Sequence, residues 1–98
     1  MEGWNNPKLH AELIADYTEK IPLIAEAGYT NLICFSGNRN GMDDLVGLHH
    51  CVEGLSKILP LAEKHGVVLQ MELLNSKVDH KDYMCDSTLW GVELCRRL

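Results

Sequence analysis

The feature that most constrains the fold is a pattern that occurs twice, 38 residues apart. Each copy contains a Pro-Leu step, then a glycine, and then a short apolar run. The prolines are Pro22 and Pro60, and the glycines are Gly28 and Gly66. A unit of this length, in which a helix ends at a glycine and a buried strand follows, is typical of α/β proteins. The sequence therefore predicts two helix–strand units in an α/β fold.

Three helices are predicted from apolar residues at helical spacing. The first follows Pro7, the second begins at Asp43 or Asp44, and the third begins at Asp86 or Ser87; these capping residues favour a helix N-terminus. Because proline lacks a backbone donor, we expect the prolines of the repeat to kink or split their helices. The apolar positions are Leu9, Leu13, Tyr17, Ile21 and Ile24, then Leu45, Leu48, Val52, Leu55, Leu59 and Ala62, and finally Trp90, Leu94 and Leu98.

Two parallel strands are predicted, near residues 31–36 and 67–74. Both runs are apolar on both faces, which is typical of parallel strands covered by helices. The order of elements is then α-β-α-β-α, and the last helix has no strand after it. Two or three strands cannot close a barrel and leave open sheet edges. We therefore expect residues 1–98 to be a fragment of a single domain that self-associates as a homo-oligomer.

Composition argues against several classes of function. Nine Lys and Arg against 14 Asp and Glu give a net charge of −5, which disfavours binding to nucleic acid or to a membrane surface. No apolar run is long enough to span a bilayer, and no signal peptide is visible. The cysteines Cys34, Cys51, Cys85 and Cys95 have no C-x-x-C spacing, so we expect free thiols in a reducing compartment. These features predict a cytoplasmic globular protein.

Glu72 is the candidate catalytic residue. It lies near the C-terminal end of the second predicted strand, whose other residues are mostly apolar. Active sites in α/β barrels and open parallel sheets gather at this end of the strands. Alternation places Glu72 on the same face as Gln70. The alternative is a structural carboxylate that pairs with a distant arginine or a buried water, because an unpartnered buried carboxylate is costly.

Two loops follow the predicted strands and contain further candidates. The loop over residues 75–86 holds Asn75, His80 and Tyr83 above the strand end that carries Glu72. A loop that covers a substrate has this composition, and so does an ordinary solvated loop. The turn over residues 36–42 contains two glycines and Arg39, which would suit an anion, although a plain turn is the favoured interpretation.

The runs over residues 32–39, 68–75 and 79–84 resemble hydroxypyruvate isomerase. They read Leu-Ile-Cys-Phe-Ser-Gly-Asn-Arg, Val-Leu-Gln-Met-Glu-Leu-Leu-Asn and Asp-His-Lys-Asp-Tyr-Met. The strand glutamate with the His-x-x-Tyr-Met loop behind it is the more specific part. That family belongs to the xylose-isomerase-like sugar isomerases and epimerases, which are (β/α)8 TIM barrels. The resemblance covers essentially all 98 residues and implies that they form the middle of such a barrel.

The resemblance implies a mechanism as well. Enzymes of this superfamily move a proton between adjacent carbons of a hydroxy-carbonyl substrate through an enediol, using two glutamates and commonly a divalent cation. Glu72 matches the first glutamate, as acid/base and as a ligand of Mg²⁺ or Mn²⁺ where a metal is used. Asn75, His80, Tyr83 and Arg39 are then substrate-binding. The second glutamate and the remaining metal ligands would lie outside these 98 residues, so activity of this chain alone is uncertain.

Three alternatives remain open. The first is a ketose 3-epimerase or inositol-pathway isomerase of the same superfamily. The second is a related DNA-repair endonuclease, which the acidic balance disfavours. The third is a non-catalytic half-barrel that self-associates through its open strand edges. The leading hypothesis is a segment of an enzyme that interconverts hydroxypyruvate and tartronate semialdehyde.

Overall fold

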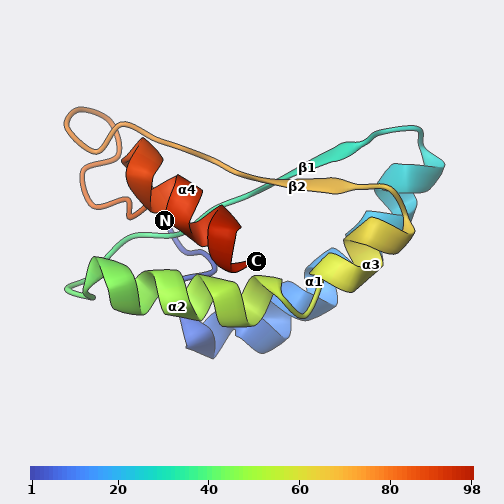
Figure 1. The fold of residues 1–98 in the computed structure, drawn as a ribbon, viewed down its shortest axis with the longest axis horizontal. Helices are drawn as coiled ribbons and strands as arrows, with labels where there is room; N and C mark the ends of the chain where they lie inside the picture. Colours follow the sequence, from blue (N-terminus) through green and yellow to red (C-terminus); the bar gives the residue numbers. More distant parts are fainter.

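A computed structural model describes all 98 residues as a mixed α/β fold with one two-stranded parallel sheet (Figure 1). The first elements are a 3-10 turn, η1 (Pro7–Leu9), and the helix α1 (His10–Glu26). Next come β1 (Asn31–Cys34), α2 (Asp44–Leu55), α3 (Leu59–Lys64), β2 (Val68–Met71) and α4 (Thr88–Arg97). The predicted order is confirmed, and the second predicted helix is split into α2 and α3 just before Pro60, which is one of the outcomes expected at that proline.

The repeated pattern of the sequence is a repeated structural unit. α1 and α3 are followed by Gly28 and Gly66, whose φ angles of 90° and 67° lie in the left-handed region that glycine adopts without strain. A strand follows each glycine, and β1 and β2 pair in parallel, with Asn31 opposite Val68. The prediction of two helix–strand units with parallel strands is confirmed.

The two prolines of the repeat have different places in their helices. Of the two outcomes expected at proline, a kink or a split, the split does not occur at Pro22, because α1 continues across it. Pro60 lies in the first turn of α3, where no backbone donor is needed. The helical segment is interrupted between Leu55, where α2 ends, and Leu59, where α3 begins. Pro60 therefore begins a helix, whereas Pro22 is accommodated inside one.

Both strands are shorter than predicted. Pairing begins at Asn31 and Val68 and stops at Cys34 and Met71, instead of covering residues 31–36 and 67–74. After β1 the carbonyls of Phe35 and Ser36 accept hydrogen bonds at 2.9 and 2.8 Å from the N-terminal residues Trp4 and Asn5. The pairing of β1 with β2 ends here because the backbone after Cys34 bonds to the N-terminal segment.

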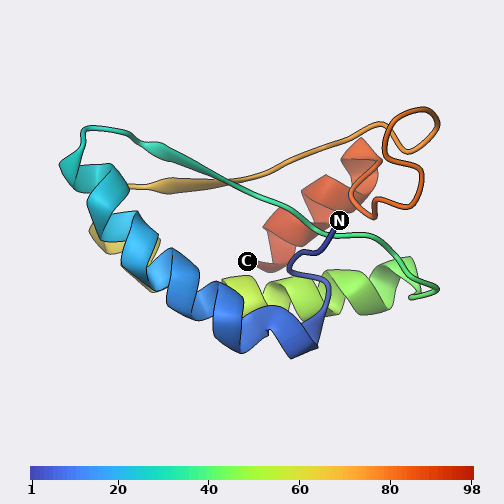
Figure 2. The same ribbon diagram turned by 180° about the vertical axis from the view of Figure 1, so that it is seen from behind.

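All the helices lie on one side of the sheet (Figures 1 and 2). The core between sheet and helices is centred on Trp4, Ile21, Leu48, Ile58, Tyr83, Met84 and Leu94, each at most 1% exposed. The other face of the sheet is uncovered and leaves Ile33, Phe35 and Val68 exposed. The structure therefore shows an open sheet of two strands, and it contains no barrel.

The buried face of α2 differs from the predicted one. Leu45 was expected in the core and is 62% exposed, whereas Gly47, Leu48, Cys51, Gly54 and Leu55 form the buried face. The glycines let neighbouring side chains come close: a Cβ at Gly54 would lie 2.7 Å from Trp4 Cε3. Leu98, predicted on the buried side of the last helix, is 43% exposed, while Trp90 and Leu94 of α4 are buried as predicted.

The four cysteines are free thiols, as predicted. Burial raises the pKa of Cys34 to about 12 and of Cys85 to about 11, and it also raises the pKa of Cys51. Cys95 on α4 is exposed. Because the thiolate is the nucleophile, we expect an aromatic disulfide reagent at neutral pH to titrate one thiol in the folded chain and four in urea. Fast reaction of more than one thiol in the folded chain would contradict the burial of the other three.

No helix combines the length and the apolar character that crossing a membrane requires.

Candidate functional site

The carboxyl ends of β1 and β2 lie side by side near the middle of the molecule, and the two long loops that follow them run toward the same end of it (Figure 1). The loop after β1 runs from residue 35 to residue 43, and the loop after β2 runs from residue 72 to residue 87. They form an isolated antiparallel bridge between Asn38 and Tyr83. The predicted site residues Arg39, Glu72, Asn75, His80 and Tyr83 are all in these two loops.

Tyr83 links the two strand ends. Its hydroxyl accepts a hydrogen bond from the Ser36 backbone N–H at 3.0 Å and donates one to the Glu72 carbonyl at 2.8 Å. The Tyr83 side chain is fully buried, and this burial raises its pKa. Its polar atom is therefore used within the chain, where it fixes the backbone of Glu72 relative to β1.

Ser36 is a further residue of this candidate site, which sequence reasoning did not single out. It is fully buried, and its side-chain oxygen accepts a hydrogen bond from the Cys85 backbone N–H at 2.9 Å. Next to it, the Met84 N–H donates to the Gly37 carbonyl at 2.9 Å. The only sequence signal is a polar residue at the end of the apolar run before Gly37. Ser36 thus joins the two loops beneath the strand ends.

Arg39 forms an ion-pair network with both loops. Its guanidinium donates to the Asp44 carboxylate at 2.7 Å, to the Asp86 carboxylate at 3.1 Å and to the Tyr83 carbonyl at 2.6 Å. Hydrogen bonds to Asp44 and Asp86 raise the pKa of Arg39 further above its usual value, despite partial desolvation. Arg39, whose charge the sequence offered for binding an anion, is therefore paired with two carboxylates of the same chain, those of Asp44 and Asp86.

Asp86 makes this network sensitive to acid. Desolvation acts to raise the pKa of Asp86, but hydrogen bonds from Ser76 and Arg39 together hold the pKa below its ordinary value of 3.8. A carboxylate whose folded pKa is lowered stabilises the fold above its ordinary pKa, and this contribution is lost as the pH falls through the folded pKa.

We therefore expect Asp86→Asn to destabilise the fold most at neutral pH. The difference from the unsubstituted chain narrows as the pH falls from 3.8 through the lower pKa of the folded chain, because Asp86 is neutral in both the folded and the unfolded chain only below that pKa. Urea unfolding at a series of pH values measures this. Since Glu93, whose pKa is also lowered, is present in both proteins, its effect cancels. A difference that stays constant with pH would contradict an ionic role for Asp86.

Glu72 is the first residue after β2. Its backbone N–H donates to the Cys34 carbonyl at 2.9 Å, so the chain still follows the sheet at this point. Side chains alternate along a strand, which places Glu72 on the uncovered face with Val68 and Gln70. Its carboxylate is partly exposed and makes no hydrogen bond or ion pair within the chain. The structural alternative, a Glu72 paired with an arginine of this chain, is not what the structure contains.

Asn75 and His80 belong to a local turn. The Asn75 side-chain oxygen accepts a hydrogen bond from the Lys77 N–H at 2.8 Å, and its carbonyl accepts one from the His80 N–H at 3.1 Å. Asn75 is exposed, and the partly exposed His80 side chain has no hydrogen-bond partner. The loop therefore leaves the His80 ring without a hydrogen-bond partner within the chain.

No group of three or more His, Cys, Asp or Glu side chains lies close enough to hold a metal ion. The residues of this chain alone therefore do not fit a complete divalent-cation site, and Glu72 is the only ligand that the sequence assigned to one.

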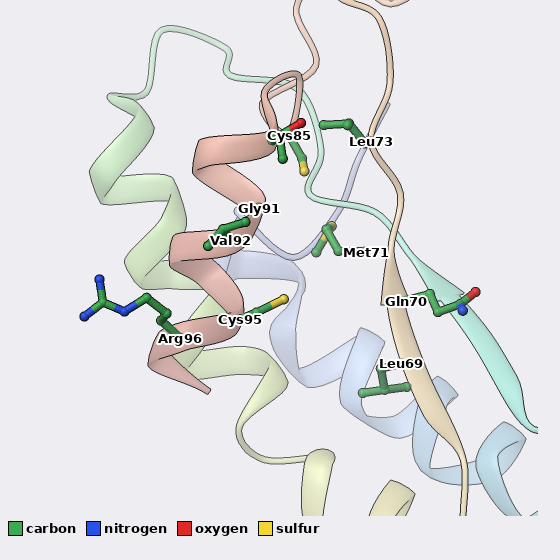
Figure 3. Close-up of a pocket in the computed structure, with 10 residues that line it drawn as sticks. Leu69, Gln70, Met71, Leu73, Cys85, Gly91, Val92, Cys95 and Arg96 are labelled. Atoms are coloured by element: carbon green, nitrogen blue, oxygen red, sulfur yellow. The ribbon is translucent and has the colours of Figure 1, made fainter.

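The largest cavity is an apolar groove of about 600 Å³ between β2 and α4 (Figure 3). It lies to the side of the strand ends, and sequence reasoning did not predict it. Leu69, Met71 and Leu73 point toward α4 from the β2 side, whereas Gln70 points away. Across the groove lie Gly91, Val92, Cys95 and Arg96 of α4, and the groove is bounded at one end by Cys85. This groove and the Glu72 strand end are separate features.

Comparison of the sequence and the structure with protein-family models, with curated proteins and with solved structures gave no match.

Proposed function

We propose that this chain is part of a TIM-barrel sugar isomerase of the hydroxypyruvate isomerase type, and that Glu72 is its catalytic acid/base. The observation that carries the proposal is the position of Glu72. A carboxylate without a partner stands directly after a parallel strand, at the end of the sheet where barrel enzymes place their catalytic groups. The resemblance of residues 68–75 and 79–84 to that family supports the same assignment.

The proposed reaction moves one proton between adjacent carbons. The Glu72 carboxylate removes a proton from C3 of hydroxypyruvate, and the C3–H electron pair forms the double bond of an enediol. A proton is then delivered to C2, a second proton moves between the two oxygens, and the product is tartronate semialdehyde. A divalent cation, Mg²⁺ or Mn²⁺, would polarise the substrate oxygens. Glu72 is the one ligand that this chain would contribute to it.

The other predicted site residues divide into two groups under this proposal. Asn75 and His80 have side chains at the loop surface and are assigned to the substrate, to which Asn75 would offer its NH₂ group because its side-chain oxygen accepts from the Lys77 N–H. Tyr83 and Arg39, which sequence reasoning also assigned to substrate binding, have their polar groups bonded within the chain. We assign them a positioning role, because they hold the Glu72 backbone and the loop behind it.

The test is proton exchange, since it needs one carboxylate and not the complete pair. The chain is incubated with hydroxypyruvate in D₂O, with and without Mg²⁺ or Mn²⁺, and loss of the C3 proton signal is followed by NMR. We expect exchange faster than in buffer with the same cation and with denatured chain. Exchange at the buffer rate would contradict the assignment of Glu72 as a base in this chain.

A further inference from the structure

The loop after β1 ends in a tight turn over residues 39–42. The Met42 N–H donates to the Arg39 carbonyl at 2.8 Å, and Asn40 and Gly41 occupy the two central positions. Their φ angles are 48° and 81°, and Asn40 is the only residue other than glycine with a positive φ. Positive φ at both central positions is characteristic of the type I′ turn, which strongly prefers Asn-Gly. The backbone of this turn therefore explains why asparagine stands directly before glycine here.

The Asn40 carboxamide has no partner in this turn. The side chain is exposed and forms no hydrogen bond, since only the backbone N–H of Asn40 is bonded, to the Asp82 carboxylate at 2.9 Å. The Gly41 N–H, next along the chain, donates to no other residue. A Cβ built at Gly41 would meet no atom within 4 Å, so the space around this peptide group is open. The turn thus places an unbonded carboxamide next to an unbonded and unhindered backbone nitrogen.

These two groups can react with each other in water. The Gly41 nitrogen gives up its proton and attacks Asn40 Cγ, so that an N–Cγ bond forms. The Cγ–Nδ2 bond breaks, and Nδ2 leaves as ammonia, which leaves a five-membered succinimide ring. Water then adds to one of the two ring carbonyls and breaks its bond to the Gly41 nitrogen. Opening at Cγ gives aspartate, and opening at the main-chain carbonyl gives isoaspartate, in which the main chain passes through Cβ.

The reaction is concentrated at one asparagine of the chain. Only Asn40 is followed by glycine, which has no Cβ to hinder ring closure. Asn75 is the nearest comparison, because it is also exposed and lies in a loop, but Ser76 follows it. The Asn75 side-chain oxygen also accepts a hydrogen bond from the Lys77 N–H at 2.8 Å, which holds the carboxamide. The asparagines of the chain are Asn5, Asn6, Asn31, Asn38, Asn40 and Asn75.

The products would disturb the contact between the two loops of the candidate site. The Arg39 N–H donates to the Asp82 carbonyl at 2.8 Å, and the Asn40 N–H donates to the Asp82 carboxylate. Either product adds a negative charge near that carboxylate, and nearby like charges repel. Isoaspartate also inserts one carbon into the main chain of the turn, which displaces the Met42 N–H from the Arg39 carbonyl. The turn then no longer holds its geometry against the loop after β2.

We propose that Asn40 is a modification site that converts spontaneously to aspartate and isoaspartate, and that isoaspartate loosens the junction between the two loops. The reaction needs water alone, and it rests neither on Glu72 nor on the proposed isomerisation. Conversion of Asn40 is faster than that of Asn75 by about tenfold or more, the rate effect of a steric cost of the size that a Cβ brings in a crowded backbone.

The test is incubation of the full folded chain in mildly alkaline buffer at physiological temperature. Samples taken over time are digested, and the amide and acid forms of each asparagine-containing peptide are quantified by mass spectrometry. Endoproteinase Asp-N, which cleaves before aspartate and not before isoaspartate, distinguishes the two products. We expect Asn40 to convert well before Asn75, with isoaspartate among its products. Asn75 serves as the matched internal control, since it is exposed in the same sample.

The effect on the loops is measured by amide hydrogen exchange. The modified chain carries one more negative charge, so anion exchange separates it from the unmodified chain. We expect the Arg39 and Met42 amides to exchange several-fold faster in the isoaspartate form, while the amides of α1 stay unchanged. Asn40→Gly is the control that accepts a positive φ and has no carboxamide, so incubation is expected to leave its Arg39 and Met42 amides as they were. Asn40→Asp carries the charge without the added main-chain carbon, and a smaller effect is expected.

Three results would overturn the proposal. Conversion of Asn40 no faster than that of Asn75 in the folded chain, with fast conversion only in urea, would mean that the turn protects the carboxamide. Aspartate without any isoaspartate would mean direct hydrolysis of the side chain, with no attack by the Gly41 nitrogen. Unchanged exchange of the Arg39 and Met42 amides in the purified isoaspartate form would mean that the modification leaves the junction of the loops intact.

Discussion

Replacing Glu72 by Gln is expected to lower the rate of C3 proton exchange in hydroxypyruvate by about 100-fold or more. General base catalysis by a positioned side chain contributes roughly 10²–10⁴-fold, and a neutral amide cannot accept the proton. Gln has nearly the same shape as Glu, so the substitution removes the base and little else. The measurement is the NMR exchange rate with hydroxypyruvate in D₂O, at saturating Mg²⁺ or Mn²⁺.

The matched control for this prediction is Glu63→Gln. Glu63 is an exposed residue of α3, remote from the carboxyl ends of the strands, and its replacement is expected to leave the exchange rate unchanged. Stability is a second control. The Glu72 carboxylate makes no hydrogen bond within the chain, so the free energy of unfolding of Glu72→Gln, measured in urea, is expected to stay within about 0.5 kcal/mol of the original. Exchange that persists in a folded Glu72→Gln chain would remove Glu72 from the mechanism.

The fold was predictable where local chemistry decides it. Gly28 and Gly66 end helices because only glycine adopts a positive φ without strain, and Asp43 and Ser87 cap helices with their own side chains. The buried face of α2 was not predictable in the same way. Gly47 and Gly54 belong to it because Met84 and Trp4, distant in sequence, pack against them. Such contacts leave no trace in local periodicity.

The candidate site divides along the same line. The apolar run predicts Glu72 near the C-terminal end of a strand over residues 67–74, whereas β2 ends at Met71 and Glu72 is the first residue after it. The roles of Arg39 and Tyr83 depend on partners 5 to 47 residues away. Residue type alone marks both as ligands for a substrate, whereas their hydrogen bonds join the two loops. The groove between β2 and α4 could not be predicted either, because its two walls come from segments about 20 residues apart, and only the tertiary fold places α4 beside β2.

Replacing Tyr83 by Phe is expected to destabilise the fold by about 2–4 kcal/mol. The substitution removes one oxygen from a fully buried position. That oxygen accepts from the Ser36 N–H and donates to the Glu72 carbonyl. Each buried backbone group that loses its only partner costs about 1–3 kcal/mol. This is a large share of the total stability of a small domain, about 5–15 kcal/mol. Urea unfolding followed by circular dichroism measures the change.

Tyr29→Phe is the matched control for this second prediction. The Tyr29 side chain is 69% exposed, so removal of its hydroxyl is expected to change stability by less than about 0.5 kcal/mol. A positioning role for Tyr83 also requires a local effect. The Ser36 amide, which loses its acceptor, is expected to exchange faster with solvent in Tyr83→Phe than the amides of α1 in the same sample. An unchanged Ser36 amide, together with an unchanged urea midpoint, would mean that the two strand ends are held together without the Tyr83 hydroxyl. The backbone of Glu72 would then be fixed by its bond to Cys34 alone.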